Sequence, residues 1–327
     1  MGPVWLLALA LASPWERQGN RFTLKLEDGR AELDWVSAST FRFARDWDRT
    51  PRRNRGGGGE PVEVSDFDTG PAVEFRTRYI TVEVRKSDLR LRVKDGQGGL
   101  LMEETAGARR EGGAVVLEGP LGAAERIYGL GVETLGALDR RGAKTETERP
   151  FFWSSGGWGR YFPSAERHRF DLGGGRLRVE IPGAQRTEHY FYYGPAPKEI
   201  LEQHLAVAPQ VRAWAPRDLE ALKPSRLPAF AVRLPGAAAP SWFALAETVA
   251  RFIHASLSGV QMPVFDLGAF DGAPEALRRR ATQLAMVSPL VMAGGGGEIE
   301  RWRVRLRPYL FAYFHEAHDR GIPVIRP

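Results

Sequence analysis

The sequence predicts a multidomain protein that combines a β domain with an α/β domain: an N-terminal β-sandwich followed by an incomplete (β/α)8 (TIM) barrel. Short segments with alternating apolar residues recur between residues 22 and 194, which is typical of a sandwich. Strand-like and helix-like segments alternate from residue 195 onward, as they do in βα units. Only 118 residues follow Pro209, whereas a complete barrel takes about 250, so we expect the first half of the barrel to be missing.

The predicted sandwich domain, residues 22–194, opens with a hairpin. Phe22, Leu24 and Leu26 alternate with polar residues, and the alternation resumes at Ala31 after a turn at residues 27–30. Further short strands are expected at residues 40–47, 72–75, 79–86, 89–94, 114–118, 176–181 and 188–193. Residues 1–21 are interpreted as a leader or signal segment, because residues 4–12 form an apolar run, although the positive charges that precede such a run in signal peptides are missing.

Residues 195–327 are predicted to form the partial TIM-barrel domain. Helices are expected at residues 197–206, 242–256, 275–286 and 299–320, with an interruption at Pro308, and strands at 229–234, 264–266, 289–292 and 323–325. The predicted buried face of the helix that begins at Trp242 consists of Phe243, Ala246, Val249, Ala250 and Ile253. Because an open half-barrel leaves apolar surface uncovered, this domain predicts homo-oligomerisation or aggregation.

The composition is that of a globular protein and argues against several kinds of site. Apolar residues make up 43% of the 327 residues, and the net charge of +6 arises from scattered arginines without a nucleic-acid-binding motif. Cysteine is absent, which excludes disulfides and thiolate metal sites, and His315 and His318 share a helical face without a third ligand. We therefore expect no metal, cofactor, nucleic acid or membrane partner. The compartment is unknown, with a cytoplasmic location favoured over a secreted one.

Residues 151–162, with the sequence FFWSSGGWGRYF, are unusually rich in aromatic residues and glycine. Aromatic rings offer large flat contact areas, and glycines allow the backbone to approach a ligand closely. The stretch therefore suits a rim on which a sugar stacks. The alternative is that the rings fill the core at the edge of a sheet, which is the more frequent role of aromatic clusters.

Two ordered sets of motifs accompany this stretch. The first comprises residues 127–133 (IYGLGVE), 138–142 (LDRRG) and 190–204 (YFYYGPAPKEILEQH). The second comprises residues 257–270 (LSGVQMPVFDLGAF), 283–290 (QLAMVSPL) and 306–310 (LRPYL). In order and wording these motifs closely resemble glycoside hydrolase family 31, the α-glucosidase and α-xylosidase family. The resemblance covers about residues 22–209 and 225–327, and we interpret the chain as a truncated or degenerate member.

The resemblance implies a sandwich of the galactose-mutarotase-like type, a TIM-barrel catalytic domain, and hydrolysis of terminal α-glucosidic or α-xylosidic bonds with retention. Such hydrolysis needs two carboxylates about 5 Å apart. The family's nucleophile lies in a Trp-x-Asp-Met-Asn-Glu type motif, which this chain lacks. Its acid/base Asp precedes the helix that corresponds to Trp242 onward, and residues 234–241 of this chain contain no carboxylate. We therefore expect no catalytic residue and an inactive chain.

Three residues are predicted to bind substrate. Asp266 matches the family's substrate-contacting Asp in an Asp-Ile-Gly-Gly-Phe type motif, in which Ala269 replaces one glycine; the alternative is an aspartate that caps a loop. Phe151 and Trp158 are the other two, since the family's N-terminal domain contributes a loop to the pocket. The family's sugar-binding His is replaced by glycine near Gly294. The carboxylates interpreted as solvated loop charge are Asp271, Glu298 and Glu300.

Three interpretations of the function remain open. The chain is either an inactive relative of the family 31 glycosidases, related to enzymes of carbohydrate metabolism, or a non-catalytic carbohydrate-binding β-sandwich protein. In both cases the expected partner is an α-linked oligosaccharide or glucan. A third interpretation is an internal deletion or a gene-model defect, in which case this form has no selected function.

Overall fold

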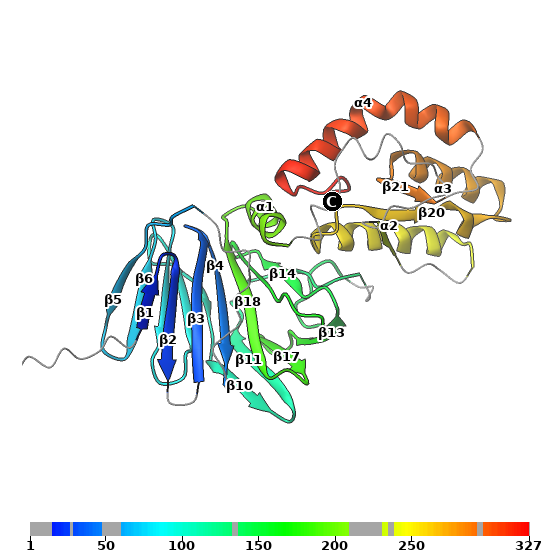
Figure 1. The fold of residues 1–327 in the computed structure, drawn as a ribbon. Coiled ribbons are helices and arrows are strands. Elements are labelled where there is room, and N and C mark those ends of the chain that lie inside the picture. The colour runs from blue at the N-terminus through cyan, green and yellow to red at the C-terminus, as the bar shows by residue number, and fades with distance from the viewer. Residues whose placement is uncertain are drawn as a thin grey trace, which may run out of the picture.

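The computed structural model describes residues 15–26, 29–47, 60–132, 137–208, 231–234, 239–292 and 297–326. A large β domain and a smaller α/β domain lie side by side (Figure 1). Helix α1 (Pro197–Val207) lies between them, where it contacts β18 (Arg186–Tyr193) of the β domain and α4 (Gly297–Arg320) of the α/β domain. The predicted combination of a β-rich domain with an α/β domain is confirmed.

The largest sheet has eight antiparallel strands in the order β1-β2-β3-β4-β18-β15-β14-β12. Besides β18, its strands are β1 (Trp15–Gln18), β2 (Arg21–Leu26), β3 (Gly29–Ser37), β4 (Thr40–Asp46), β15 (Trp158–Tyr161), β14 (Phe151–Ser154) and β12 (Ile127–Gly129). The predicted hairpin is confirmed as β2 and β3, with Leu24 opposite Ala31, while residues 27 and 28 of its turn lie outside the described residues. The predicted leader, residues 1–21, is corrected at its end, because residues 15–18 form strand β1 of this sheet. Residues 1–14 lie outside the described residues.

Two five-stranded antiparallel sheets pack against this sheet. The first contains β5 (Ser65–Asp68), β6 (Ala72–Arg76), β7 (Ile80–Arg85), β8 (Leu91–Asp95) and β9 (Leu100–Glu103), and the second, in spatial order, β10 (Ala106–Glu111), β11 (Ala114–Pro120), β17 (Arg176–Pro182), β16 (His168–Asp171) and β13 (Lys144–Thr147). One apolar core joins all three sheets. The ring of Phe22 lies 4.6 Å from that of Phe75 in the first, and the ring of Phe152 lies 5.8 Å from that of Phe170 in the second.

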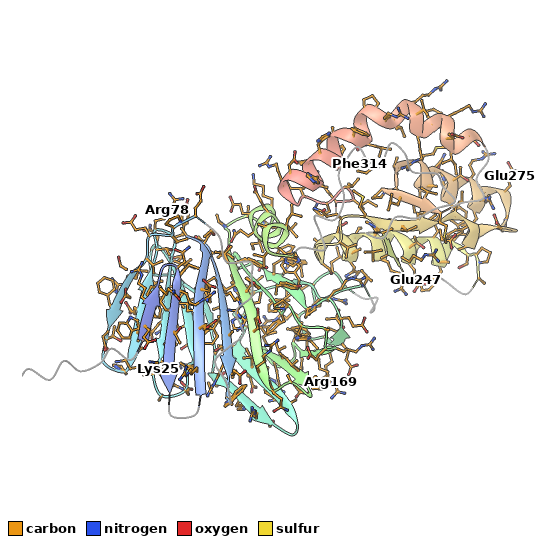
Figure 2. The ribbon with its side chains drawn as sticks, in the orientation of Figure 1. Lys25, Arg78, Arg169, Glu247, Glu275 and Phe314 are labelled. Atoms are coloured by element: carbon orange, nitrogen blue, oxygen red, sulfur yellow. The ribbon has the colours of Figure 1, made fainter. Side chains whose placement is uncertain are left out.

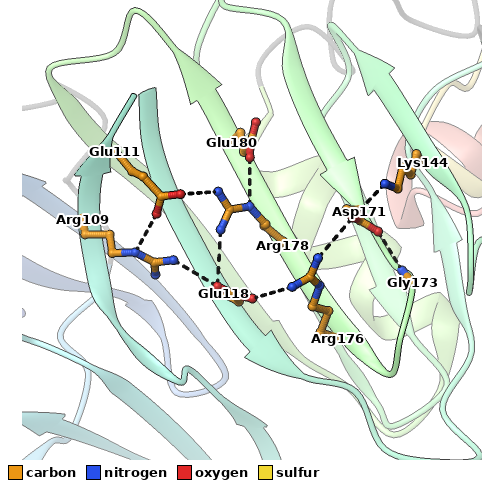
Figure 3. A network of polar contacts seen from close by, with 9 residues as sticks. All are labelled: Arg109, Glu111, Glu118, Lys144, Asp171, Gly173, Arg176, Arg178 and Glu180. Carbon is orange, nitrogen blue, oxygen red and sulfur yellow. Dashed lines mark hydrogen bonds and ion pairs between the residues drawn. The ribbon is translucent and has the colours of Figure 1, made fainter. Parts of the chain in front are cut away.

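The outer face of the second five-stranded sheet carries a network of ion pairs (Figure 3). The guanidinium of Arg178 donates to Glu180 and to Glu111, each at 2.9 Å, and Arg109 donates to Glu118 at 3.0 Å. Several of these side chains are exposed, so each pair contributes little to stability. The alternation of this charged face with the apolar face toward the core explains the period-two pattern of the sequence.

The α/β domain is built on three parallel strands, β19 (Val232–Arg233), β20 (Pro263–Asp266) and β21 (Leu290–Met292). Helix α2 (Trp242–Leu257) connects the first two strands and α3 (Glu275–Val287) connects the last two, while α4 follows β21. These elements agree with the predicted helices and strands to within a few residues. Residues 229 and 230 of the predicted first strand lie outside the described residues.

One face of this small sheet is covered mainly by α2 and α3, together with Ile299 of α4, and the other by the later part of α4. Phe265 and Val291 face a core shared with α2 and α3, whereas Val264 and Leu290 face a second core shared with Phe314 of α4. Figure 1 shows α2 and α4 on opposite sides of β20. In a TIM barrel all helices lie outside, and the inner face is filled by side chains of the other strands. The described residues therefore form a three-layer arrangement, and the predicted barrel is not confirmed.

The buried face of α2 differs from the predicted one. Phe243 is 73% exposed and Val249 is 40% exposed, while Ala244, Phe252 and Ala255 are buried. The helix is thus rotated so that positions 244, 252 and 255 face the sheet and β12. Periodicity alone could not distinguish the two faces, because apolar residues occur on both sides of this helix.

Two predictions near the end of the chain are also wrong. Helix α4 continues through Pro308 without interruption, because Pro308 lies on the exposed side, where water can solvate the Val304 carbonyl that loses its hydrogen bond. Residues 323–325 form no strand, although Val324 and Ile325 pack against the two different cores. None of the described helices, α4 included, is long and apolar enough to cross a membrane.

Candidate functional site

Asp266 is the last residue of β20 and lies at the carboxyl edge of the parallel sheet. Its neighbours Phe265 and Leu267 are buried, which leaves Asp266 exposed at the surface. The Oδ1 atom accepts a hydrogen bond of 2.9 Å from the backbone N–H of Gly268 and so caps the short 3-10 helix Leu267–Phe270. Ala269, which replaces a family glycine, packs against the core below. The capping role is therefore present, and the second carboxylate oxygen of Asp266 is available to a ligand.

A second carboxylate lies close to Asp266. A methyl group placed on Gly268 would come within 3.1 Å of Asp266 Oδ1 and 3.9 Å of Asp271 Oδ2. Asp271, however, forms an ion pair with Arg278 of α3, although its side chain is 63% exposed. The predicted solvated carboxylates Glu298 and Glu300 are exposed in the first turn of α4. Their negative charges are stabilised there by the positive end of the helix dipole.

The other two strand ends offer no carboxylate. The residues after β19, at positions 234–241, and those after β21, at positions 293–296, contain neither Asp nor Glu. Since active sites of (β/α) folds are built from loops at this edge, Asp266 and Asp271 are the carboxylates that these three connections can supply. Within the described ranges, no three His, Cys, Asp or Glu side chains gather closely enough to hold a metal ion.

Phe151 and Trp158 do not form an exposed rim. Phe151 is 1% exposed and Trp158 is 2% exposed, so the predicted position of these rings at the surface is corrected to a position in the core. Trp158 stacks on Phe191 with ring centroids 6.1 Å apart, and its indole N–H donates to Glu125 at 2.9 Å. The buried indole thus has a hydrogen-bond partner for its N–H, as buried tryptophans usually do. Whether either ring contacts a sugar stays a prediction.

Phe151 instead belongs to the joint between the two domains. Its ring lies flat on that of His204 in α1, with centroids 3.8 Å apart and planes 3° apart. The hydroxyl of Tyr192 lies 3.2 Å from His204 Nδ1. Burial lowers the pKa of His204 to about 3, so the imidazole is neutral at neutral pH. The sequence pattern correctly places His204 on the buried face of α1 together with Ile200 and Leu201, but it does not indicate the ring stack.

Hydrogen bonds between side chains and the backbone also hold this joint. Trp153 of β14 donates its indole N–H to the carbonyl of Leu257 at the end of α2, at 3.1 Å. The Ser258 hydroxyl accepts from the Gly131 N–H at 3.0 Å and lies 3.1 Å from the Gly131 carbonyl. These contacts join segments more than 100 positions apart in the sequence. Residues 127–132 of the first family-like motif and residues 257–260 of the second thus lie close together, and their contacts join the two domains.

Comparison with solved structures places this fold among known enzymes. A glycoside hydrolase family 31 dextranase from Flavobacterium johnsoniae, in complex with isomaltotriose, matches with a TM-score of 0.52 and 22% identity over 59% of this chain and 27% of its own. The fold resembles that of family 31 enzymes. A family 31 α-xylosidase from a soil metagenome, in complex with xylose, matches with a TM-score of 0.51 and 16% identity over 59% of this chain and 34% of its own.

The cycloalternan-forming enzyme of Listeria monocytogenes, in complex with a pentasaccharide substrate, matches with a TM-score of 0.51 and 15% identity over 78% of this chain and 26% of its own. The chain therefore spans about a quarter to a third of the length of these three proteins. No protein-family model and no curated protein sequence matches the chain. The resemblance to family 31 is thus supported at the level of the fold.

Proposed function

We propose that the chain is a carbohydrate-binding relative of the family 31 glycosidases that binds an α-linked oligosaccharide at the carboxyl edge of its parallel sheet without hydrolysing it. The observation that carries this proposal is the chemistry of that edge. It presents two exposed carboxylates, those of Asp266 and Asp271, between two connections that contain no Asp or Glu, and of the two only Asp271 forms an ion pair among the described residues.

The geometry supports binding better than catalysis. A retaining mechanism requires one carboxylate that attacks the anomeric carbon and a second that protonates the leaving oxygen. Asp266 could serve as a hydrogen-bond acceptor for sugar hydroxyls, and charge-assisted bonds of this kind are strong. Its neighbour Asp271 is engaged in an ion pair with Arg278, which leaves no unpaired second carboxylate at this edge for a retaining mechanism. The edge therefore offers an acceptor for a sugar but no acid for its hydrolysis.

The test is the turnover of p-nitrophenyl α-glucoside and p-nitrophenyl α-xyloside by the purified chain, beside Asp266→Asn and Asp271→Asn variants. We expect no release of p-nitrophenol above the uncatalysed rate from any of the three proteins. We also expect the unmodified chain to bind isomaltotriose, and Asp266→Asn to weaken that binding by about tenfold, as for a lost charge-assisted hydrogen bond. Turnover that disappears in Asp266→Asn or Asp271→Asn would contradict the proposed inactivity.

The alternative of a binding site formed by Phe151 and Trp158 on the sandwich receives no support from their burial. A sugar would need to displace rings that are packed against His204 and Phe191. Loss of isomaltotriose binding in a Trp158→Phe variant that retains its thermal stability would favour this alternative over a site at Asp266.

A further inference from the structure

A cleft of about 620 Å³ lies on the β domain, away from Asp266. Three segments form its walls: residues 36–38 at the end of β3 and just after it, residues 60–63 and 65 before and at the start of β5, and residues 76–78 at the end of β6 and just after it. Phe67 of β5 completes the lining. Figure 2 labels Arg78 at this end of the β domain, the end nearer to α1, whereas Lys25 lies at the opposite end. The volume falls in the range of small-molecule sites.

Hydrogen bonds hold the walls of the cleft in place. The side chain of Asn20 donates to the Glu60 carbonyl at 3.0 Å and accepts from the Val62 N–H at 2.9 Å, so it fixes one wall from both sides. The Thr77 hydroxyl donates to the Ala38 carbonyl at 2.6 Å, which ties the other two walls together. Because these walls are fixed by the fold, a ligand would not need to order them, and preformed sites bind at lower entropic cost.

The side chains that line the cleft are chemically mixed. Glu60 and Glu63 supply two carboxylates, and among the described residues neither side chain has a hydrogen bond or an ion pair with another. Arg76 and Arg78 supply two guanidinium groups. The Arg76 guanidinium lies 4.8 Å from the centre of the Phe67 ring, and Phe67 is nevertheless 46% exposed. The cleft thus combines acceptors, donors and an apolar surface.

This combination selects one class of ligand. The lining has no net charge, because its two glutamates balance its two arginines. Arg76 also forms an ion pair with Glu74, which does not line the cleft. The lining therefore provides no net attraction for an anion such as a phosphate or a nucleic acid. A purely apolar ligand would leave the carboxylates desolvated and unpaired, which is costly. A neutral sugar offers hydroxyl groups that donate to carboxylates and accept from guanidinium groups, and its apolar faces suit an aromatic ring.

We propose that this cleft is a second carbohydrate site, which binds a neutral oligosaccharide of two or three hexose units independently of Asp266. Glu60 and Glu63 accept hydrogen bonds from sugar hydroxyls, Arg78 donates to them, and Phe67 packs against the sugar ring. The site would attach the β domain to the same class of glycan that the sheet edge binds, so that the two sites together raise the affinity for a long chain.

The experiment is calorimetric titration of the complete chain with isomaltotriose. Two variants change the cleft, Glu63→Gln and Phe67→Ala, and their controls, Glu83→Gln and Leu100→Ala, lie on the adjoining five-stranded sheet with side chains outside the lining. Leu100 is 52% exposed, close to the 46% of Phe67. We expect each cleft variant to weaken one binding event by about tenfold, as for the loss of a charge-assisted hydrogen bond or an aromatic contact, and each control to bind like the unmodified chain.

The Asp266→Asn variant separates the two proposed sites. If the cleft binds sugar, Asp266→Asn retains the binding event that Glu63→Gln weakens. Binding that is lost only in Asp266→Asn would overturn the proposed cleft site and support the site at Asp266. Binding that is lost only in the cleft variants would support the cleft site and overturn the site at Asp266. Absence of any isomaltotriose binding would overturn both. Binding of dextran sulfate that is stronger than that of isomaltotriose and is weakened by Phe67→Ala but not by Leu100→Ala would show that the cleft selects anions and would overturn its assignment to neutral sugars.

Discussion

Gly259 occupies a position at the domain joint that tolerates no side chain. Its φ angle is +77°, and a methyl group on Gly259 would lie 2.8 Å from Cδ2 and 3.1 Å from Nε2 of His204. The imidazole cannot retreat, since its ring lies flat on Phe151 at 3.8 Å. An alanine in the left-handed region costs about 1–2 kcal/mol, and overpacking of a tight core adds about 1–3 kcal/mol. Gly259→Ala should therefore lower the free energy of unfolding by about 2–5 kcal/mol.

The matched control is Gly183→Ala, because Gly183 has a φ angle of +71° but a methyl group on it would meet no atom within 4 Å. This variant should carry only the backbone cost of about 1–2 kcal/mol. Equilibrium unfolding in urea, followed by tryptophan fluorescence, measures both changes, and Trp153 at the joint is one of the reporters. If the two variants unfold at the same urea concentration, the close contact between Gly259 and His204 does not contribute to stability, and the reasoning is refuted.

Two further predictions concern the joint and the exposed face of α2. Burial lowers the pKa of His204 to about 3, whereas the histidine of an unfolded chain has a pKa near 6.5. Between these two pH values the unfolded chain binds a proton that the folded chain does not. The contribution of His204 to stability is therefore complete above about pH 6.5 and decreases as the pH falls toward 3. A His204→Gln variant should show a flatter dependence of urea stability on pH between about 6.5 and 4, and an unchanged slope would contradict this. Phe243, at 73% exposure, should promote self-association, so Phe243→Lys should lower the sedimentation coefficient at high protein concentration; an unmodified chain that sediments as a monomer would refute it.

Local patterns in the sequence were sufficient for the helices α1 to α4 and for strands such as β2 and β3, but not for short strands such as β5, β13 and β14. The alternation of Phe22, Leu24 and Leu26 predicts a strand because one face of the sheet is buried and the other solvated. Proline is favoured in the first turn of a helix, and Ile200, Leu201 and His204 recur at helical spacing, so Pro197 and these residues predict α1. The motifs also indicated the resemblance to family 31, and the absence of the catalytic Asp motifs is a property of the sequence alone.

What the sequence could not determine depends on which faces meet. The aromatic residues of the stretch 151–162 are compatible with a rim or a core, and only the packing of Phe151 on His204 and of Trp158 on Phe191 shows that these rings are buried. The cleft beside Phe67 could not be foreseen either, because its walls come from three separate segments.

The sequence by itself indicated the helices α1 to α4, many of the strands, the likeness to family 31 and the lack of the family's catalytic Asp motifs, since all of these depend on residues close together in the chain. Only the tertiary structure decided that α4 covers the face of the sheet that a barrel would fill with its own strands, and that α2 turns Phe243 outward. The physical reason is that burial of an apolar face is non-directional. Any element that reaches the face can cover it, and the local pattern does not specify which one does.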